Sequence, residues 1–219
     1  HTGFKGGWLS LWLQAMGANV FGYALEPDSK TNMFDRAEVG KGMHSVFGDL
    51  LDIEHLEREM VAFAPDVVFH LAAQPIVLDA HAAPRETYIT NIIGTVNLFE
   101  CIRKTKSIKA IVNITTDKCY KNVGSQKIFS EEDRLGGSDP YSSSKASVEL
   151  ISDAYRSSYF NELEIGLATG RAGNVIGGGD WGKYRLVPDI LASLHAGERV
   201  IVRSPNSIRP WQHVLEPLQ

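Results

Sequence analysis

Short apolar runs that alternate with helical stretches constrain the fold of this chain more than any other feature of its sequence. Five runs have the length and composition of strands, namely Asn19–Tyr23, Ser45–Phe47, Val67–Ala72, Ala110–Thr115 and Ile165–Arg171. Four longer stretches show the helical spacing of apolar residues, namely Trp8–Met16, Ile53–Phe63, Thr87–Lys104 and Tyr141–Phe160. Because parallel neighbouring strands need crossover connections, this alternation predicts an α/β fold with a doubly wound parallel sheet.

Composition excludes several classes of protein. With 219 residues, of which 43% are hydrophobic, the chain can bury the core of one substantial domain. The net charge is −4 and acids and bases are interspersed, so nucleic acid is not an expected partner. No apolar stretch approaches the roughly 20 residues needed to span a bilayer. Two cysteines, Cys101 and Cys119, do not make a disulfide framework, so we expect a cytoplasmic protein. No metal site is predicted.

The N-terminal segment has the spacing of a phosphate-binding loop. Thr2-Gly3-Phe4-Lys5-Gly6 opens directly into a helix, and its glycines fit the last two of a Gly-x-x-Gly-x-x-Gly pattern. One such glycine lets the backbone approach a pyrophosphate, and N–H groups at the helix start face the phosphates. Two glycines before a helix also occur in ordinary turns. The preceding strand and first glycine are absent from the sequence, so we expect a Rossmann-like fold whose N-terminal strand is missing from the chain.

Two further segments follow predicted strands. Asp49, in Gly48-Asp49-Leu50, could accept a hydrogen bond from an adenine amino group, or could be a loop acid that caps the next helix. Val67–Ala72 is apolar throughout, as expected of a strand covered on both faces. Leu71-Ala72-Ala73-Gln74 then leaves room for a flat ligand, although ordinary tight packing explains small residues equally well. His70 alone is interpreted as a core histidine.

The strongest chemical signal is a pair of motifs. Thr115-Thr116-Asp117-Lys118 ends one predicted strand, and Tyr141 and Lys145 stand four apart on a predicted helix. Residues four apart share a helical face, so the lysine ammonium can stabilise the tyrosine phenolate and make it a general base. The same lysine can bond a nicotinamide ribose. A lone Tyr-x-x-x-Lys is common by chance, whereas its combination with a threonine-rich strand end in this topology is specific.

Together these motifs resemble the extended short-chain dehydrogenase/reductase family. Five further stretches are similar to its sugar-nucleotide 4,6-dehydratases, and most similar to those that act on CDP-glucose; they are residues 1–9, 72–75, 115–120, 171–181 and 209–218. Lys118 stands where dehydratases of dTDP-glucose carry glutamate. The resemblance implies a dinucleotide-binding and catalytic domain over residues 1–175. Residues 176–219, with a predicted helix Val187–Ala196 and strand Arg199–Val202, would begin a substrate-binding region.

The resemblance also implies roles for individual residues. Thr116 would bond the sugar O4, Tyr141 would be the base with Lys145 as its electrostatic partner, Asp117 would protonate the departing C6 hydroxyl, and Lys118 would assist proton removal at C5. The implied cofactor contacts are Thr2, Gly3, Phe4, Lys5, Gly6, Asp49, Leu50, Leu71, Ala72, Ala73, Gln74, Asn91, Thr115, Tyr141 and Lys145. The implied substrate contacts are Thr116, Asn174, Arg185, Leu186, Arg203 and Arg209. Arginine suits a diphosphate through bidentate bonds, although solvated surface arginines are the alternative.

The implied activity is dehydration of a nucleotide-linked glucose, with CDP-glucose expected, to the 4-keto-6-deoxy sugar. NAD is the expected cofactor; NADP stays open because Gly22–Ala24 offers no NAD-selecting carboxylate and Glu26 is displaced. A 4-epimerase shares the fold and Tyr-x-x-x-Lys but needs no acid beside the strand-end threonine. A truncated, non-catalytic dinucleotide-binding module is the alternative of another class. The two long helices imply a homodimer, or a dimer of dimers, through a four-helix bundle.

Overall fold

The structure, a computed structural model, describes residues 1–27, 29–122, 124 and 127–219. Its contacts divide the chain into two compact units. One combines His1–Phe47 with Gly173–Gln219, and the other is Gly48–Ala172. The predicted domain boundary between residues 175 and 176 stays a prediction; the structure groups everything after Ala172 with the N-terminal segment.

The unit Gly48–Ala172 contains a three-stranded parallel sheet with helical crossovers. Its elements in chain order are α3 (Ile53–Phe63), β3 (Val67–His70), α4 (Val77–Ala82), α5 (Pro84–Tyr88), η1 (Ile89–Ile93), α6 (Gly94–Lys104), β4 (Ala110–Ile114), η2 (Asp117–Cys119), α7 (Pro140–Tyr155), η3 (Arg156–Phe160) and β5 (Gly166–Gly170). Strand β4 lies between β3 and β5, with Ala110 opposite both Val67 and Gly166. The parallel α/β arrangement predicted from the alternating pattern is therefore present in this unit.

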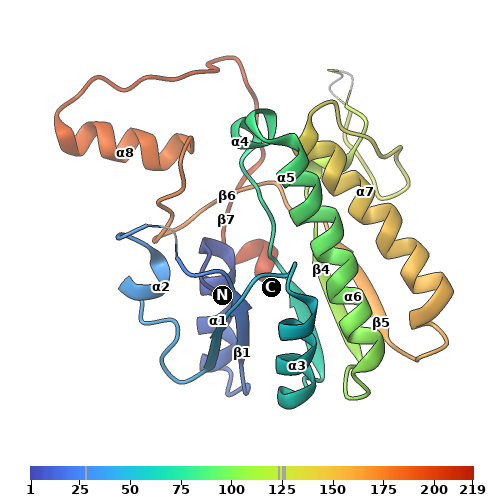
Figure 1. Cartoon of the computed structure of the whole chain (residues 1–219). Helices are drawn as coiled ribbons and strands as arrows, with labels where there is room; N and C mark the ends of the chain where they lie inside the picture. The colour runs from blue at the N-terminus through green and yellow to red at the C-terminus, as the bar shows by residue number, and fades with distance from the viewer. Residues whose placement is uncertain (28, 123, 125–126) are drawn as a thin grey trace. The chain divides into compact units, whose positions relative to one another are not determined.

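Helices cover one face of this sheet. In Figure 1, α5, η1 and α6 form one continuous rod that runs alongside α7, and α3 packs beside α6. Side chains alternate across a strand, so His70 is buried toward this layer while Val67 and Phe69, on the other face, are 44% and 39% exposed. Within this unit the helices lie on the His70 side, and the expectation that the strand is covered on both faces stays a prediction.

Local signals explain where these helices begin and end. Helix α3 spans the predicted range, with the Asp52 carboxylate accepting from the His55 amide at 3.0 Å and Ala64 ending it in the left-handed region. The predicted helix Tyr141–Phe160 is α7 followed by the π-helical turn η3. Its layer is anchored by almost fully buried side chains, namely Phe99, Ile102, Ile111, Val148 and Phe160. Burying each such side chain contributes about 1.5–3 kcal/mol.

The other unit holds two short parallel pairs of strands. Its elements are α1 (Phe4–Ala15), β1 (Phe21–Ala24), α2 (Met33–Arg36), β2 (His44–Phe47), β6 (Asn174–Ile176), α8 (Leu186–Ala196), β7 (Trp211–His213) and η4 (Glu216–Leu218). Strand β1 pairs with β2, and β6 pairs with β7. The predicted strand Arg199–Val202 is wrong: the segment is irregular, and Ile201 is 75% exposed. Strand β7 pairs with β6 instead and leads into the buried Val214.

Two properties of the described residues bear on the predicted class. None of their helices is both long and apolar enough to cross a membrane. Cys101 and Cys119 are buried, free thiols. Burial raises the pKa of each thiol to about 11, so both are protonated near neutral pH.

Candidate active site

The carboxyl end of β4 leads into a tight turn that carries polar side chains. Thr115 and Thr116 are buried, and β4 keeps pairing beyond its last residue: the Thr115 amide donates to Gly170 O at 2.8 Å, and the Asp117 amide donates to Ala172 O at 3.2 Å. The Thr116 hydroxyl oxygen accepts from the Lys118 amide at 3.4 Å and so caps the single turn η2. Open α/β sheets put their chemistry at this edge.

Helix α7 brings Tyr141 and Lys145 to the same place. Asp139 caps the helix by accepting from the Ser142 amide at 2.9 Å. Tyr141 and Lys145 are 8% and 5% exposed, and the Lys145 ammonium donates to Ile114 O, the last carbonyl of β4, at 2.9 Å. The Lys118 Nζ lies 6.0 Å from the centre of the Tyr141 ring.

The structure thus gathers the five predicted catalytic side chains around the end of β4. The Thr116 hydroxyl also donates to the Asp117 carboxylate at 3.2 Å, so the threonine lies between the turn and the strand. Groups that can exchange protons with a hydroxyl therefore stand together, with Tyr141 and Lys145 buried and Asp117 and Lys118 half-buried. Their individual roles stay predictions.

Asn91 links this helix to the segment that follows β3. It lies in the π-helical turn η1, a feature frequent at functional sites. Its amide group donates to Ser144 Oγ at 2.8 Å and to Gln74 O at 3.2 Å, and accepts from the Gln74 amide at 2.8 Å. Both amide hydrogens are therefore used within the protein, and Asn91 fixes Gln74 relative to α7. Its predicted contact with a cofactor stays a prediction.

His70 is a buried, neutral member of the same region. Its Nε2 lies 3.0 Å from the Thr95 hydroxyl, whose own hydrogen goes to Asn91 O at 2.6 Å. Thr95 must then accept from His70, which assigns the proton of the ring to Nε2. Burial, assisted by the positive charge of Lys145, lowers the pKa of His70 to about 3. This agrees with the interpretation of His70 as a core histidine rather than a base.

The remaining cofactor candidates of this unit lie in two connecting segments. In the first, the Asp49 carboxylate accepts from the Leu51 amide at 2.9 Å, and Asn97 donates to Leu50 O at 2.9 Å. The second, Leu71–Gln74, is half-buried and directly follows β3. Both segments are held at defined places by helix α6 or its extension η1.

In the other unit, the N-terminal loop fits a pyrophosphate. Helix α1 begins at Phe4, and its N-cap Gly3 supplies no side-chain bond to the first amides. A Cβ on Gly6 would lie 3.0 Å from the backbone nitrogen of His1, whereas a Cβ on Gly3 would meet nothing within 4 Å. A side chain at Gly6 would be tightly packed against the backbone of His1, whereas Gly3 leaves open space beside the helix start. The Thr2 hydroxyl ties the loop to Leu25 O at 2.9 Å.

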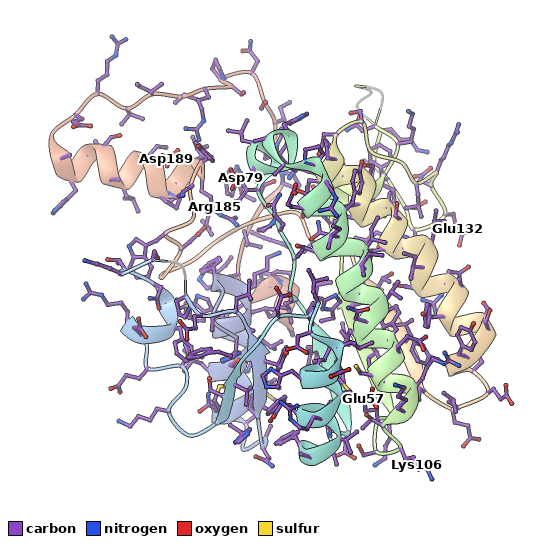
Figure 2. All side chains as sticks on the ribbon, in the orientation of Figure 1. Glu57, Asp79, Lys106, Glu132, Arg185 and Asp189 are labelled. Carbon is purple, nitrogen blue, oxygen red and sulfur yellow. The ribbon has the colours of Figure 1, made fainter. Side chains whose placement is uncertain are left out.

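The predicted substrate residues belong to this second unit and divide into two sets. Arg185 and Leu186 begin α8, and Figure 2 shows Arg185 near Asp189 at that end of the helix. Arg203 joins them by donating to the Asp189 carboxylate at 2.8 Å. Asn174, in β6, and Arg209, in the exposed stretch before β7, lie outside this group; the buried Asn174 Oδ1 has no hydrogen-bond partner among the described residues.

Sequence reasoning missed two residues of this corner. Glu149 lies one helical turn after Lys145, and Arg171 directly follows β5; together they form a buried ion pair. The Tyr141–Lys145 spacing predicts one shared helical face, and Glu149 continues it into the buried side of the helix. An acid on such a face needs a partner, which is the signal that could have found the pair.

The sequence is similar to those of known sugar-nucleotide dehydratases. The sequence profile of the GDP-mannose 4,6 dehydratase family matches residues 1–218. The CDP-glucose 4,6-dehydratase of Salmonella typhimurium is 52% identical over 223 residues, a match that covers 100% of this chain and 62% of that enzyme. The chain therefore spans less than two thirds of the length of this relative.

Solved structures show the same fold. The dTDP-glucose 4,6-dehydratase of Bacillus anthracis in complex with NAD has a TM-score of 0.82 at 26% identity, covering 99% of this chain and 66% of that one. The UDP-glucose 4-epimerase of Thermotoga maritima with UDP-glucose has a TM-score of 0.86 at 24% identity, covering 99% and 68%. The predicted Rossmann-like fold and the resemblance to 4,6-dehydratases are confirmed. The chain belongs to the GDP-mannose 4,6 dehydratase family, within the extended short-chain dehydrogenase/reductases.

Proposed function

We propose that this chain is the cofactor-binding and catalytic part of a sugar-nucleotide 4,6-dehydratase that acts on CDP-glucose. The observation that carries the proposal is the placement of Asp117 and Lys118 on a turn against the helix of Tyr141 and Lys145. A buried residue pair for oxidation and a half-buried residue pair for elimination lie next to each other. The 52% identity to a CDP-glucose 4,6-dehydratase supports the choice of nucleotide.

NAD is the proposed cofactor. The open helix start at Thr2–Gly6 suits its pyrophosphate; in the other unit, Asp49–Leu50 and Leu71–Gln74 are the proposed contacts, with Thr115 and Asn91. The relative from Bacillus anthracis is in complex with NAD, which supports NAD over NADP. When bound, NAD would supply reversible hydride transfer, out of the sugar C4 and back into C6.

The first step assigned to the protein is removal of the C4 hydroxyl proton. Tyr141 accepts this proton as general base, and the Lys145 ammonium stabilises the phenolate. The bond from Lys145 to Ile114 O holds the ammonium on the tyrosine's side of the helix. The Thr116 hydroxyl orients the sugar by bonding O4.

The second step is elimination of water across C5 and C6. The new 4-keto group acidifies the C5 proton, and Lys118 assists its removal. Asp117 donates a proton to the C6 hydroxyl, which leaves as water. The diphosphate and base of the substrate are assigned to Asn174, Arg185, Leu186, Arg203 and Arg209, of which the arginines offer charge-assisted bonds.

Two alternatives lead to different products. A 4-epimerase shares the fold, as the Thermotoga maritima enzyme illustrates, but has no use for an acid beside Thr116. A non-catalytic module has no use for Tyr141 and Lys145, yet both are present and buried together.

We further propose a cytoplasmic homodimer, or a dimer of dimers, assembled through α6 and α7.

The test offers the full-length protein CDP-, dTDP- and UDP-glucose with NAD, each sugar carrying deuterium at C4. The expected result is a 4-keto-6-deoxy product from CDP-glucose, with deuterium at C6 and no net NADH. Stoichiometric NADH release would indicate a simple dehydrogenase, and recovery of the 4-epimer would indicate an epimerase. A stronger reaction with another nucleotide would overturn the choice of CDP-glucose alone.

A further inference from the structure

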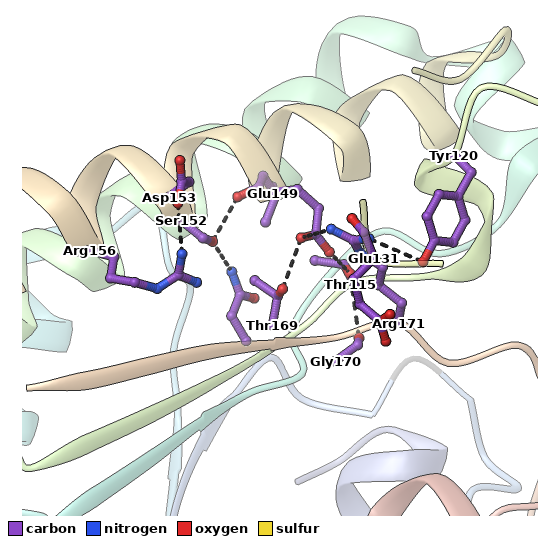
Figure 3. A network of polar contacts seen from close by, with 12 residues as sticks. Thr115, Tyr120, Glu131, Glu149, Ser152, Asp153, Arg156, Thr169, Gly170 and Arg171 are labelled. Atoms are coloured by element: carbon purple, nitrogen blue, oxygen red, sulfur yellow. Dashed lines mark hydrogen bonds and ion pairs between the residues drawn. The ribbon is translucent and has the colours of Figure 1, made fainter. Parts of the chain in front are cut away.

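A buried ion pair lies behind the proposed catalytic residues. Figure 3 shows Glu149, from α7, facing Arg171, which directly follows β5. Arg171 Nη2 lies 2.9 Å from Glu149 Oε2, and the two side chains are only 16% and 4% exposed. A charge this deeply buried is strongly unfavourable without its partner, so the two residues act as a unit.

The Glu149 carboxylate accepts three hydrogen bonds from residues at or just beyond the ends of β4 and β5. It accepts from the Thr115 hydroxyl, from the Thr169 hydroxyl at 2.9 Å and from Arg171. Burial alone would raise the pKa of Glu149, but these hydrogen bonds outweigh it and the pKa lies below its ordinary value. Glu149 is therefore an anion that ties α7 to both β4 and β5.

Two residues one helical turn apart on α7 form hydrogen bonds with two consecutive residues at the carboxyl end of β4. Lys145 donates to Ile114 O at 2.9 Å, and Glu149, one turn later, accepts from Thr115. The next residue along the strand end is Thr116, a proposed substrate contact. The position of α7 along β4 is thus fixed where the proposed catalytic residues begin.

Arg171 extends the connection to both sides of the turn η2. Its Nη1 donates to the Tyr120 hydroxyl at 3.1 Å and to Glu131 O at 3.2 Å, and its guanidinium stacks 5.0 Å from the centre of the Tyr120 ring. Its neighbour Ala172 accepts from the Asp117 amide at 3.2 Å. The arginine side chain therefore contacts the segment after the turn, while the carbonyl of the next residue, Ala172, holds the turn's first residue.

We propose that Glu149 and Arg171 are positioning residues, which hold Asp117 and Lys118 in register with Tyr141 and Lys145. The proposal rests on the dehydratase function proposed above. Displacements of about 1 Å at reacting groups can cost about 10²-fold in rate, so loss of the pair should slow turnover even where the fold survives. A purely structural ion pair would instead lower stability and leave the kcat of the folded protein unchanged.

The test compares three variants of the full-length enzyme with CDP-glucose and NAD. Glu149→Gln keeps the length of the side chain and removes its charge. Arg171→Lys keeps the positive charge but replaces the planar guanidinium, so the arginine's several hydrogen bonds cannot all form. Asp153→Asn is the matched control, because Asp153 lies one turn after Glu149, is 75% exposed and pairs with Arg156 at 2.8 Å. Steady-state kinetics give kcat and KM, and amide hydrogen exchange reports Thr115, Asp117 and Lys121.

For Glu149→Gln we expect kcat to fall about 10–100-fold, with KM for both ligands changed less than about threefold. Exchange of the Thr115 and Asp117 amides should become faster. For Arg171→Lys the Thr115 amide should stay protected, while the Lys121 amide, which donates to Arg134 O at 2.8 Å, exchanges faster and kcat falls less. Asp153→Asn should match the wild type in every measurement.

A kcat of Glu149→Gln within about twofold of the wild type, or a loss of stability alone, overturns the positioning role. If Glu149→Gln does not fold, the kcat and the stability of Arg171→Lys are judged by the same criteria. If the wild type converts none of the nucleotide sugars, the proposed function fails. Amide exchange then decides separately: unchanged protection of Thr115 and Asp117 in Glu149→Gln overturns the positioning role too.

Discussion

At the scale of single residues, helix α7 carries two tyrosines whose surroundings differ, so we expect different roles for them. Tyr141 is buried near Lys145 and Lys118, whereas the Tyr155 hydroxyl donates to Glu100 at 2.8 Å. Burial and this hydrogen bond raise the pKa of Tyr155 to about 12, so Tyr155 cannot act as a base near neutral pH.

Tyr141→Phe should therefore lower kcat by about 10²–10⁴-fold, the usual worth of a positioned general base, while the fold survives. The matched control Tyr155→Phe should keep full turnover and lose about 1 kcal/mol of stability with its hydrogen bond. Turnover and thermal unfolding followed by circular dichroism check both variants. Near-wild-type turnover of Tyr141→Phe would leave Tyr141 only a packing role.

Asp117 and Lys118 are expected to act after oxidation, so their loss should separate the two steps. Asp117→Asn and Lys118→Met should bind substrate, reduce NAD once and stall at the 4-keto-glucose stage. A single-turnover experiment should show a burst of nicotinamide absorbance followed by little 6-deoxy product. Lys121→Met, an exposed lysine three residues on, is the control and should complete the reaction. Equal slowing of oxidation and elimination would contradict the assignment.

His70 makes the stability of the protein depend on pH. Its pKa is 6.5 in the unfolded reference and about 3 in the folded protein, so below about pH 6.5 the unfolded chain binds a proton that the folded chain does not. The free energy of unfolding should then fall by about 1.4 kcal/mol per pH unit toward acid. Urea unfolding at about pH 7 and about pH 5 should show a contribution of about 2 kcal/mol that His70→Gln lacks. An identical pH dependence in both proteins would mean that His70 titrates normally.

At the scale of elements, the N-cap of α7 links stability to catalysis. Asp139 accepts from the Ser142 amide and lies two residues before Tyr141, whereas Asp52 caps α3 in the same way, through His55, away from the proposed catalytic residues. Asp139→Ala and Asp52→Ala should each cost about 1 kcal/mol of stability. Only Asp139→Ala should also lower kcat. Thermal melts and kinetics measured on both variants check this, and equal kcat values would show that the cap does not position Tyr141.

The elements also show what local pattern can and cannot predict. Helix α3 was predicted residue for residue, because its cap and its period are both local signals. Strands β6 and β7 have three residues each and pair across more than thirty intervening positions, so no local period marks them. Arg199–Val202 has the apolar pattern of a strand, but this segment does not pair with another strand among the residues that the structure describes.

The same limit applies to the proposed catalytic corner. The Tyr141–Lys145 spacing and the threonine-rich strand end are short motifs that a sequence shows directly, and the structure brings them near each other. Glu149 and Arg171 are 22 positions apart and join only when β5 returns beside β4. Their pairing depends on sheet topology, which a single sequence indicates only in outline.

At the scale of the whole molecule, the outer surface of α7 predicts assembly. Leu150 is 62% exposed on this helix, and Ile93, the last residue of η1 directly before α6, is 47% exposed; helices α6 and α7 run side by side in Figure 1. Apolar side chains on paired helices are the elements of a symmetric four-helix interface, in which each residue meets its counterpart's surface. Leu150→Glu should therefore shift the full-length protein from dimer toward monomer in sedimentation equilibrium, because each interface would bury two uncompensated charges. Leu191→Glu is the matched control: Leu191 is 61% exposed but lies on α8. An unchanged mass for Leu150→Glu, or an equal shift for Leu191→Glu, would place the interface elsewhere.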